Sequence, residues 1–324
     1  MKFERKVYIC QNKNELIRMD STSGGVFSAL AQYVLDRKGV VFGAEFDNMY
    51  RVVHGKGNAA ADLSKFRGSK YVQSNMGDTF NEVKNLLQDK RWVLFTGTPC
   101  EVAGLKSFLE KDYENLILMD IVCFSVASPG VWEQYLVHLQ NTGKINLNEV
   151  SRIKFRDKSR FGYEYTLMTF YDKKGHKLLA SGPESNQMLR SFVSNTVTRP
   201  SCYKCAFKTV ERVSDFTAWD CYNIFQYNKK MDDNKGTSHL MVHNEKAANI
   251  LEEIKQYLFV VEVDVHEAIK SEPAMTEFFK RLSNNEDPFN SYFKDSARIK
   301  VERLLRTTLS SIGLYKYVKR MLKG

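Results

Sequence analysis

The pattern of apolar residues is most informative between residues 92 and 123. Residues 92–96 form an apolar run without polar alternation, which is typical of a strand covered on both faces in a parallel sheet. Apolar residues at helical spacing follow from Val102 to Leu109, and a second apolar run spans residues 116–122. This order predicts a strand, a helix and a second strand, joined by the right-handed crossover that parallel strands almost always adopt.

Strands and helices also alternate on both sides of this unit. Apolar runs predict strands over residues 6–10, 40–46 and 51–54, and helical spacing predicts helices over 26–35, 80–87 and 129–142. After about residue 145 the pattern changes to hairpin-like segments that turn at Lys174 and Gly175. We therefore predict an α/β fold with a mixed, largely parallel sheet and flanking helices, plus a second α+β portion.

These changes of pattern divide the chain into three parts. We expect an N-terminal α/β domain over residues 1–145 and a C-terminal α+β domain over 146–290. Residues 291–324 carry apolar side chains at helical spacing with a basic opposite face, which predicts a basic amphipathic tail helix. Such a helix either docks on a membrane surface or a partner protein, or packs on its own domain.

The net charge of +10 is concentrated in this tail. Residues 291–324 contain nine Lys or Arg against two acidic residues, a net of +7, so the rest of the chain carries only +3. We therefore do not expect nucleic acid as a partner, because a binder of nucleic acid usually has a basic body. No apolar run reaches the roughly 20 residues that span a bilayer, and the N-terminus has no signal-peptide pattern. A cytoplasmic protein is expected, peripheral at the membrane if the tail docks there.

Four of the six cysteines are placed where they could act together. Cys100 and Cys123 follow the two strands of the central unit and thus share the carboxyl edge of the sheet, where ligands bind in parallel sheets. Cys100 also lies near a helix N-terminus, which favours a thiolate. Cys202 and Cys205 form a Cys-x-x-Cys pair in a loop. Isolated thiols often only fill space, but four converging thiols suit an iron–sulfur cluster or a four-thiolate zinc site.

Two further stretches resemble anion-binding segments. Hydroxyl residues and glycines at Ser23, Gly24 and Gly25 open a helix, an arrangement that leaves N–H groups free for a phosphate; an ordinary helix cap is the alternative. Residues 65–74 are rich in donors, including Arg67, Ser69 and Lys70, although a solvated basic face has the same composition.

Six motifs in order resemble those of the coenzyme F420 hydrogenase and dehydrogenase beta subunit family. They are residues 23–28, 67–73, 96–100, the strand end at Cys123, 155–158 and 199–205, and the resemblance covers about residues 6–260. It implies a flavoprotein oxidoreductase with a [4Fe–4S] cluster and with FAD rather than FMN, acting on a small-molecule substrate. The implied cluster ligands are Cys100, Cys123, Cys202 and Cys205. The implied flavin or substrate contacts are Ser23, Gly24, Gly25, Arg67, Ser69, Lys70, Thr96 and Thr98.

Departures from the family pattern refine these expectations. Relatives often carry an N-terminal ferredoxin-like segment, whereas only Cys10 precedes Ser23 here, which implies a separate ferredoxin-like electron donor. The usual Cys-His-Gly is replaced by Cys123, Phe124 and Ser125. The chain looks like the divergent bacterial branch associated with polysaccharide biosynthesis. The alternative function is a non-redox scaffold or binding module with a four-thiolate metal site in a polysaccharide-synthesis complex.

Overall fold

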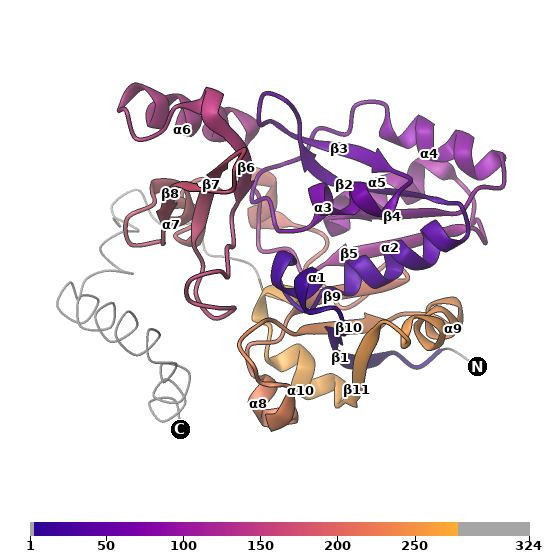
Figure 1. Cartoon of the computed structure of the whole chain (residues 1–324). Helices are drawn as coiled ribbons and strands as arrows, with labels where there is room; N and C mark the ends of the chain where they lie inside the picture. Colours follow the sequence, from indigo (N-terminus) through magenta and orange to yellow (C-terminus); the bar gives the residue numbers. More distant parts are fainter. Residues whose placement is uncertain (1–2, 278–324) are drawn as a thin grey trace.

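An eight-stranded sheet forms the centre of the part of the chain that the computed structural model describes, residues 3–277 (Figure 1). Its strands in chain order are β1 (Lys6–Asn12), β2 (Val40–Phe46), β3 (Val52–Gly57), β4 (Val93–Gly97), β5 (Leu116–Ile121), β9 (Phe216–Asp220), β10 (Ser238–Val242) and β11 (Leu258–Val263). The order across the sheet is β11-β1-β10-β9-β5-β4-β2-β3. The adjacent strands β9, β5, β4 and β2 are parallel, and the remaining pairings are antiparallel.

Helices cover both faces of this sheet. Apolar side chains of α2 (Val26–Asp36) and α9 (Glu245–Ile254) pack on one face, together with α3 (Leu63–Phe66). The other face is covered by α4 (Thr79–Gln88) and α5 (Pro99–Leu109), while α10 (Val265–Lys270) packs on side chains of β1, β9 and β10. The two short helices α1 (Glu15–Asp20) and α8 (Ile224–Tyr227) lie on connections. The central strands are therefore buried on both sides, as their unbroken apolar runs predict.

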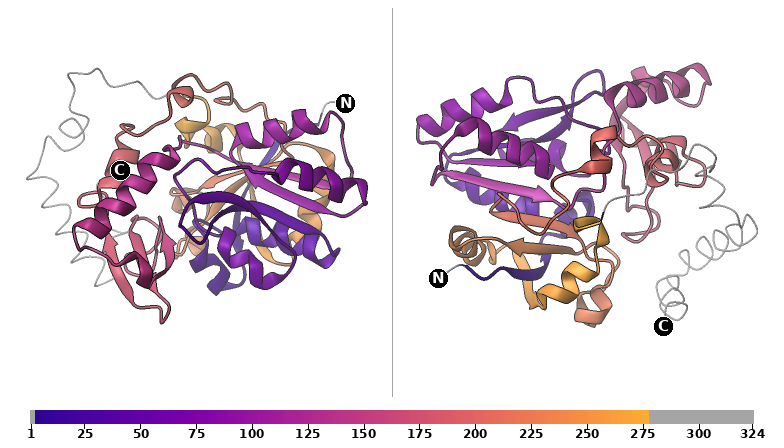
Figure 2. Two further views of the ribbon diagram at one scale, coloured as in Figure 1. Left: turned by 90° about the horizontal axis from the view of Figure 1, so that it is seen from above. Right: turned by 180° about the vertical axis from the view of Figure 1, so that it is seen from behind.

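A three-stranded antiparallel sheet forms a smaller second layer beside the large sheet (Figure 2). It consists of β6 (Val150–Lys154), β7 (Met168–Asp172) and β8 (Lys177–Ser181), and it packs with α6 (Pro129–Asn141) and α7 (Gln187–Val193) around a separate apolar core. Val52 and Val72 belong to the same core, so the small sheet is joined to the β2–β3 side of the large one.

The predicted fold class is confirmed. The expected unit over residues 92–123 is β4, α5 and β5, and the hairpin expected to turn at Lys174 and Gly175 is β7 and β8. The chain leaves the large sheet after β5 and returns to it at β9, so the large sheet takes strands from both sides of residue 145. The division of the chain at residue 145 stays a prediction. The tail helix expected over residues 291–324, and any membrane or partner contact made through it, lies outside the described residues.

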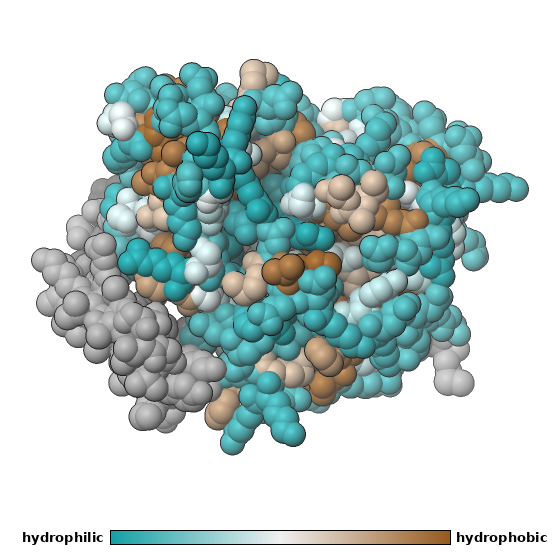
Figure 3. Space-filling model, in the orientation of Figure 1, coloured by the Kyte–Doolittle hydropathy of each residue, from teal (hydrophilic) through white to brown (hydrophobic). Residues whose placement is uncertain are grey.

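The visible surface is largely hydrophilic, with apolar side chains in small scattered patches (Figure 3). None of the helices between residues 3 and 277 combines the length and the apolar character that crossing a bilayer requires.

Replacing Trp132 in α6 tests the second core. Its indole is fully buried and donates a hydrogen bond to the Tyr50 carbonyl at 2.7 Å. We expect Trp132→Ala to lower the free energy of unfolding by about 3–5 kcal/mol, because it leaves a cavity and an unpaired carbonyl. Val137→Ala on the same helix, at a side chain that is 54% exposed, is the control and should change it by less than about 0.5 kcal/mol. Urea denaturation measures the free energy of unfolding of both variants. Equal losses in the two variants would contradict the assignment of Trp132 to the second core.

Candidate functional site

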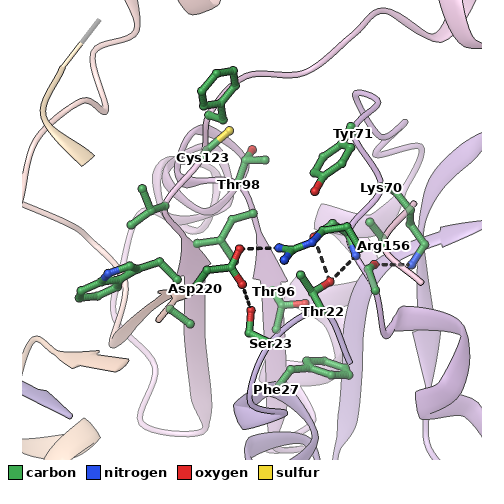
Figure 4. A pocket seen from close by; sticks show the side chains of 18 of the residues that line it. Thr22, Ser23, Phe27, Lys70, Tyr71, Thr96, Thr98, Cys123, Arg156 and Asp220 are labelled. Atoms are coloured by element: carbon green, nitrogen blue, oxygen red, sulfur yellow. Dashed lines mark hydrogen bonds and ion pairs between the residues drawn. The ribbon is translucent and has the colours of Figure 1, made fainter. Parts of the chain in front are cut away.

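A cavity of about 490 Å³ opens at the carboxyl edge of the parallel strands (Figure 4). Residues at the ends of β4, β5 and β9 line it, and the loop before α2 and residues next to the small sheet close its sides. This is the edge where ligands bind in open α/β sheets. The volume lies within the range of about 300–1,000 Å³ that is usual for small-molecule and cofactor sites.

Seven of the eight residues expected to contact a flavin or substrate line this cavity. They are Ser23, Gly25, Arg67, Ser69, Lys70, Thr96 and Thr98. Gly24 is not among the lining residues. A β-carbon on Gly24 would lie 2.2 Å from the Cys10 carbonyl oxygen and 2.6 Å from the Ser238 nitrogen. Gly24 thus lets the loop lie directly on the sheet, and a contact between it and a cofactor stays a prediction.

The N-terminus of α2 faces the cavity without a side-chain cap. Gly25 is the N-cap residue, with a φ of 83° in the left-handed region, and no side chain bonds the first free N–H groups of the helix. Val26 and Phe27 also line the cavity. Unpaired N–H groups and the helix dipole attract an anion at this point.

Hydrogen bonds to other parts of the chain and within the segment hold residues 67–70 in place. The Thr22 hydroxyl accepts a hydrogen bond from the Ser69 nitrogen at 2.7 Å, and the Arg67 guanidinium donates to Ser28 Oγ at 3.0 Å. Lys70 Nζ lies 3.0–3.4 Å from the carbonyl oxygens of residues 65–68, so the ammonium caps the end of α3. Burial lowers the pKa of Lys70 to about 7, against the attraction of Glu45.

A buried ion pair forms the floor of the cavity. Arg156, which follows β6, donates to one oxygen of Asp220 at the end of β9, and Ser23 Oγ and Tyr163 donate to the other oxygen. Arg156 also donates to the Tyr222 hydroxyl at 2.5 Å. Burial alone would raise the pKa of Asp220, but the Arg156 guanidinium and the Ser23 hydroxyl hold it below its usual value.

Neither Arg156 nor Asp220 was predicted to be a site residue. Arg156 lies in a charged stretch that belongs to one of the family motifs. Its partner Asp220 is 64 residues away along the chain, so no local sequence pattern indicates that the two residues form a pair. Charged residues near the ends of strands were the only available signal.

A second polar chain reaches the cavity from α5. The Glu101 carboxylate accepts from the Thr98 nitrogen at 2.7 Å and from Ser74 Oγ at 2.9 Å. The Ser74 hydroxyl in turn lies 2.7 Å from Nδ1 of the buried His54, whose Nε2 lies 2.9 Å from the Thr96 carbonyl oxygen. This chain fixes the turn between β4 and α5, on which Thr98 and Cys100 are placed.

The four expected metal ligands lie at one rim beside the cavity. Cys100 is the second residue of α5, Cys123 follows β5, and Cys202 and Cys205 lie at the short 3₁₀ turn Pro200–Lys204. Burial raises the pKa of Cys123, and the negative charge of Cys100 and of Cys202 raises it further. Partial burial likewise raises the pKa of Cys100, with smaller contributions from Cys205 and Cys202. These effects connect Cys123 with Cys100 and Cys202, and Cys100 with Cys202 and Cys205.

Lys208 holds the Cys-x-x-Cys segment against the end of β5. Its Nζ donates to the carbonyl oxygen of Cys123 at 2.9 Å and to that of Ala274 at 2.6 Å. Cys10 in β1 and Cys221, directly after β9, are fully buried. Within residues 3–277, no three Cys, His, Asp or Glu side chains surround a single point closely enough to hold one metal ion.

Replacing Asp220 tests the ion pair. Asp220→Asn leaves the Arg156 charge buried without its partner, so we expect a loss of about 3–5 kcal/mol in the free energy of unfolding at neutral pH. The folded-state pKa of Asp220 is depressed, so the pair stabilises the fold above the unfolded pKa of about 3.9 and this contribution disappears as pH falls through the lower folded value. The difference between wild type and variant should therefore shrink below about pH 4. A pH-independent difference in urea melts would contradict this account.

Comparison with known proteins identifies the family of the chain. The model for the C-terminal part of the coenzyme F420 hydrogenase/dehydrogenase beta subunit matches residues 90–267, more than half of the 324 residues. Among solved structures, a chain of the F420-reducing [NiFe] hydrogenase complex from Methanosarcina barkeri is similar in fold, with a TM-score of 0.54 and 13% identity over 84% of this chain and 89% of that one. No curated protein sequence matches the chain. On the strength of the family model, the chain belongs to the coenzyme F420 hydrogenase/dehydrogenase beta subunit family, a family of oxidoreductase subunits.

Proposed function

We propose that this protein is an iron–sulfur flavoprotein that transfers electrons between a [4Fe–4S] cluster at the thiol rim and a flavin in the adjacent cavity. The observation that carries the proposal is the position of Cys123. Its side chain lines the cavity, and its thiol interacts electrostatically with Cys100 and Cys202. A cluster ligand in the cavity wall would bring the two redox centres close together.

The donor set of the rim suits a cluster. Four thiolates are the usual ligands of a [4Fe–4S] cluster, and a structural zinc site can use the same set. A zinc ion holds all four sulfur atoms at about 2.3 Å from one metal ion. In a four-iron cluster each thiolate binds a different iron, so the four sulfur atoms lie farther apart. The cluster would supply one-electron transfer and the flavin two-electron chemistry. The protein itself would hold Cys123 in the cavity wall. Cys123 follows β5 directly, and Lys208 bonds its carbonyl oxygen.

The cavity also has features that suit a flavin. Its lining combines apolar residues such as Val26, Met119 and Phe192 with the uncapped end of α2. An apolar wall accepts a ring system, and the helix end accepts a phosphate group. The buried indole N–H of Trp219, another lining residue, has no hydrogen-bond partner among residues 3–277. An acceptor atom on the bound ligand would satisfy it. The family resemblance favours FAD over FMN.

The family resemblance also supports the less specific parts of the proposal. These are a small-molecule substrate, a separate ferredoxin-like electron donor, a cytoplasmic location and a role in capsule or exopolysaccharide biosynthesis.

The absorption spectrum of the protein purified without oxygen tests the cofactors. We expect about four irons and one flavin per chain, with broad visible absorption that dithionite bleaches. One zinc per chain with only aromatic absorption, even after cluster reconstitution, would contradict the proposal. It would favour the scaffold or binding module with a four-thiolate site instead.

Replacing single cysteines tests the ligand assignment. Cys100→Ser should lose most of the iron and the visible absorption while keeping a cooperative melt, because this thiol is exposed and its loss leaves no cavity. Cys221→Ser is the matched control. This thiol is fully buried away from the rim, so the variant should lose stability but retain its iron. Iron content that is equal in the two variants would remove Cys100 from the ligand set.

A further inference from the structure

Thr98 touches both the cavity and the thiol rim. It is the N-cap residue of α5 and lines the cavity. Its hydroxyl oxygen lies 3.1 Å from Sγ of Cys100, the second residue of the same helix. One side chain therefore lies between a proposed cluster ligand and the cavity proposed for the flavin.

The backbone of Thr98 is held in place without any help from its hydroxyl. The Thr98 nitrogen donates to the Glu101 carboxylate at 2.7 Å, and the Ser74 hydroxyl donates to the same carboxylate at 2.9 Å. A β-carbon on Gly97 would lie 2.8 Å from a Glu101 carboxylate oxygen, so the glycine leaves room for this contact. Pro99 follows with its restricted φ. The hydroxyl is thus brought to Cys100 by a turn that is already built in the chain without a cluster.

Iron ligation would fix the direction of this hydrogen bond. Between a hydroxyl and a free thiol, either atom can donate. A cysteine that binds iron has lost its proton, so its sulfur can only accept and Thr98 must donate. A donor at a ligand sulfur stabilises the additional negative charge that a cluster carries after reduction.

We propose that Thr98 is a positioning residue that donates a hydrogen bond to Cys100 Sγ and thereby raises the reduction potential of the [4Fe–4S] cluster. The inference rests on the proposed function, because it needs a cluster at the thiol rim. The step that it affects is the uptake of one electron by the cluster from the one-electron donor. The hydroxyl keeps its proton before and after this step. Its single hydrogen is then used, so only the hydroxyl oxygen remains for a ligand in the cavity.

A redox titration of the full chain without oxygen, followed by the electron paramagnetic resonance of the reduced cluster, tests the proposal. Thr98→Val removes the donor and keeps the branched shape of the side chain. At a fixed potential, the ratio of reduced to oxidised cluster should fall by up to about tenfold, because the reduced form loses a stabilising hydrogen bond. A tenfold change corresponds to a midpoint potential lower by about 59 mV for one electron. Thr98→Ser keeps the hydroxyl and should remain close to wild type.

Thr142→Val is the matched control. This residue is the C-cap of α6, and its hydroxyl donates to the His138 carbonyl oxygen at 2.7 Å. Thr142 does not line the cavity, so its replacement removes a bonded hydroxyl and should leave the potential of the cluster unchanged. Circular dichroism melts verify the fold of each variant.

The potential of the flavin, followed by visible absorption in the same titration, separates the two possible roles of Thr98. The proposal predicts a shift for the cluster in Thr98→Val and none for the flavin. A shift confined to the flavin would overturn the proposal and favour a direct contact between Thr98 and the flavin. An unchanged cluster potential in a folded, iron-containing Thr98→Val would also overturn it and leave the proposed function intact.

A measurement on wild type covers the case in which Thr98→Val does not fold or does not hold iron. The hydrogen of the hydroxyl exchanges with solvent, so transfer into D₂O should shift an iron–sulfur stretching mode in the resonance Raman spectrum. The absence of any shift would overturn the role of Thr98. Wild type without iron, even after cluster reconstitution, would overturn the proposed function and this inference together.

Discussion

The carboxylate of Asp220 has to be kept charged inside the protein, and much of the site is arranged to do so. A buried charge is stable only when opposite charge and hydrogen-bond donors surround it. Arg156 and Tyr163 provide these donors from the β6–β7 connection, and Ser23 provides one from the loop before α2. Each of these segments also contributes to the cavity or supports it. The electrostatic requirement of one residue therefore helps to fix the mutual positions of the α2 loop, the β6–β7 connection and the end of β9.

The thiol rim and the cavity share one edge of the sheet because their residues follow parallel strands. Thr98 and Cys100 follow β4, Cys123 follows β5, and Tyr222 follows β9. Strands that run in the same direction bring their carboxyl ends together, so short segments after each strand meet without long loops. Lys208 attaches the Cys-x-x-Cys segment to this edge, because its ammonium group donates a hydrogen bond to the Cys123 carbonyl oxygen. The proposed cluster ligands after β4 and β5 and the cavity are thus neighbours through the topology of the backbone.

Local sequence patterns predicted the parts of the structure that depend on neighbouring residues. The β4–α5–β5 unit and the loop before α2 follow from apolar spacing, proline and glycine. Long-range features had no such signal. The antiparallel pairing of β1 with β10 and β11, the Arg156–Asp220 pair and the carbonyl contacts of Lys158 join residues more than 60 positions apart. Lys70 lines the cavity as expected of a ligand contact, but the capping of a short helix by its ammonium had no local signal either.

The position of β1 has a consequence for the order of folding. This first strand lies between β10 and β11, the last two strands of the sheet. During synthesis, β1 therefore has no sheet neighbour until residues beyond 238 have left the ribosome. Contacts between distant segments form slowly, because loop closure must precede them. The loop before α2 lies directly on β1 and β10, as the position of Gly24 shows, so the cavity is completed only when the ends of the described chain meet.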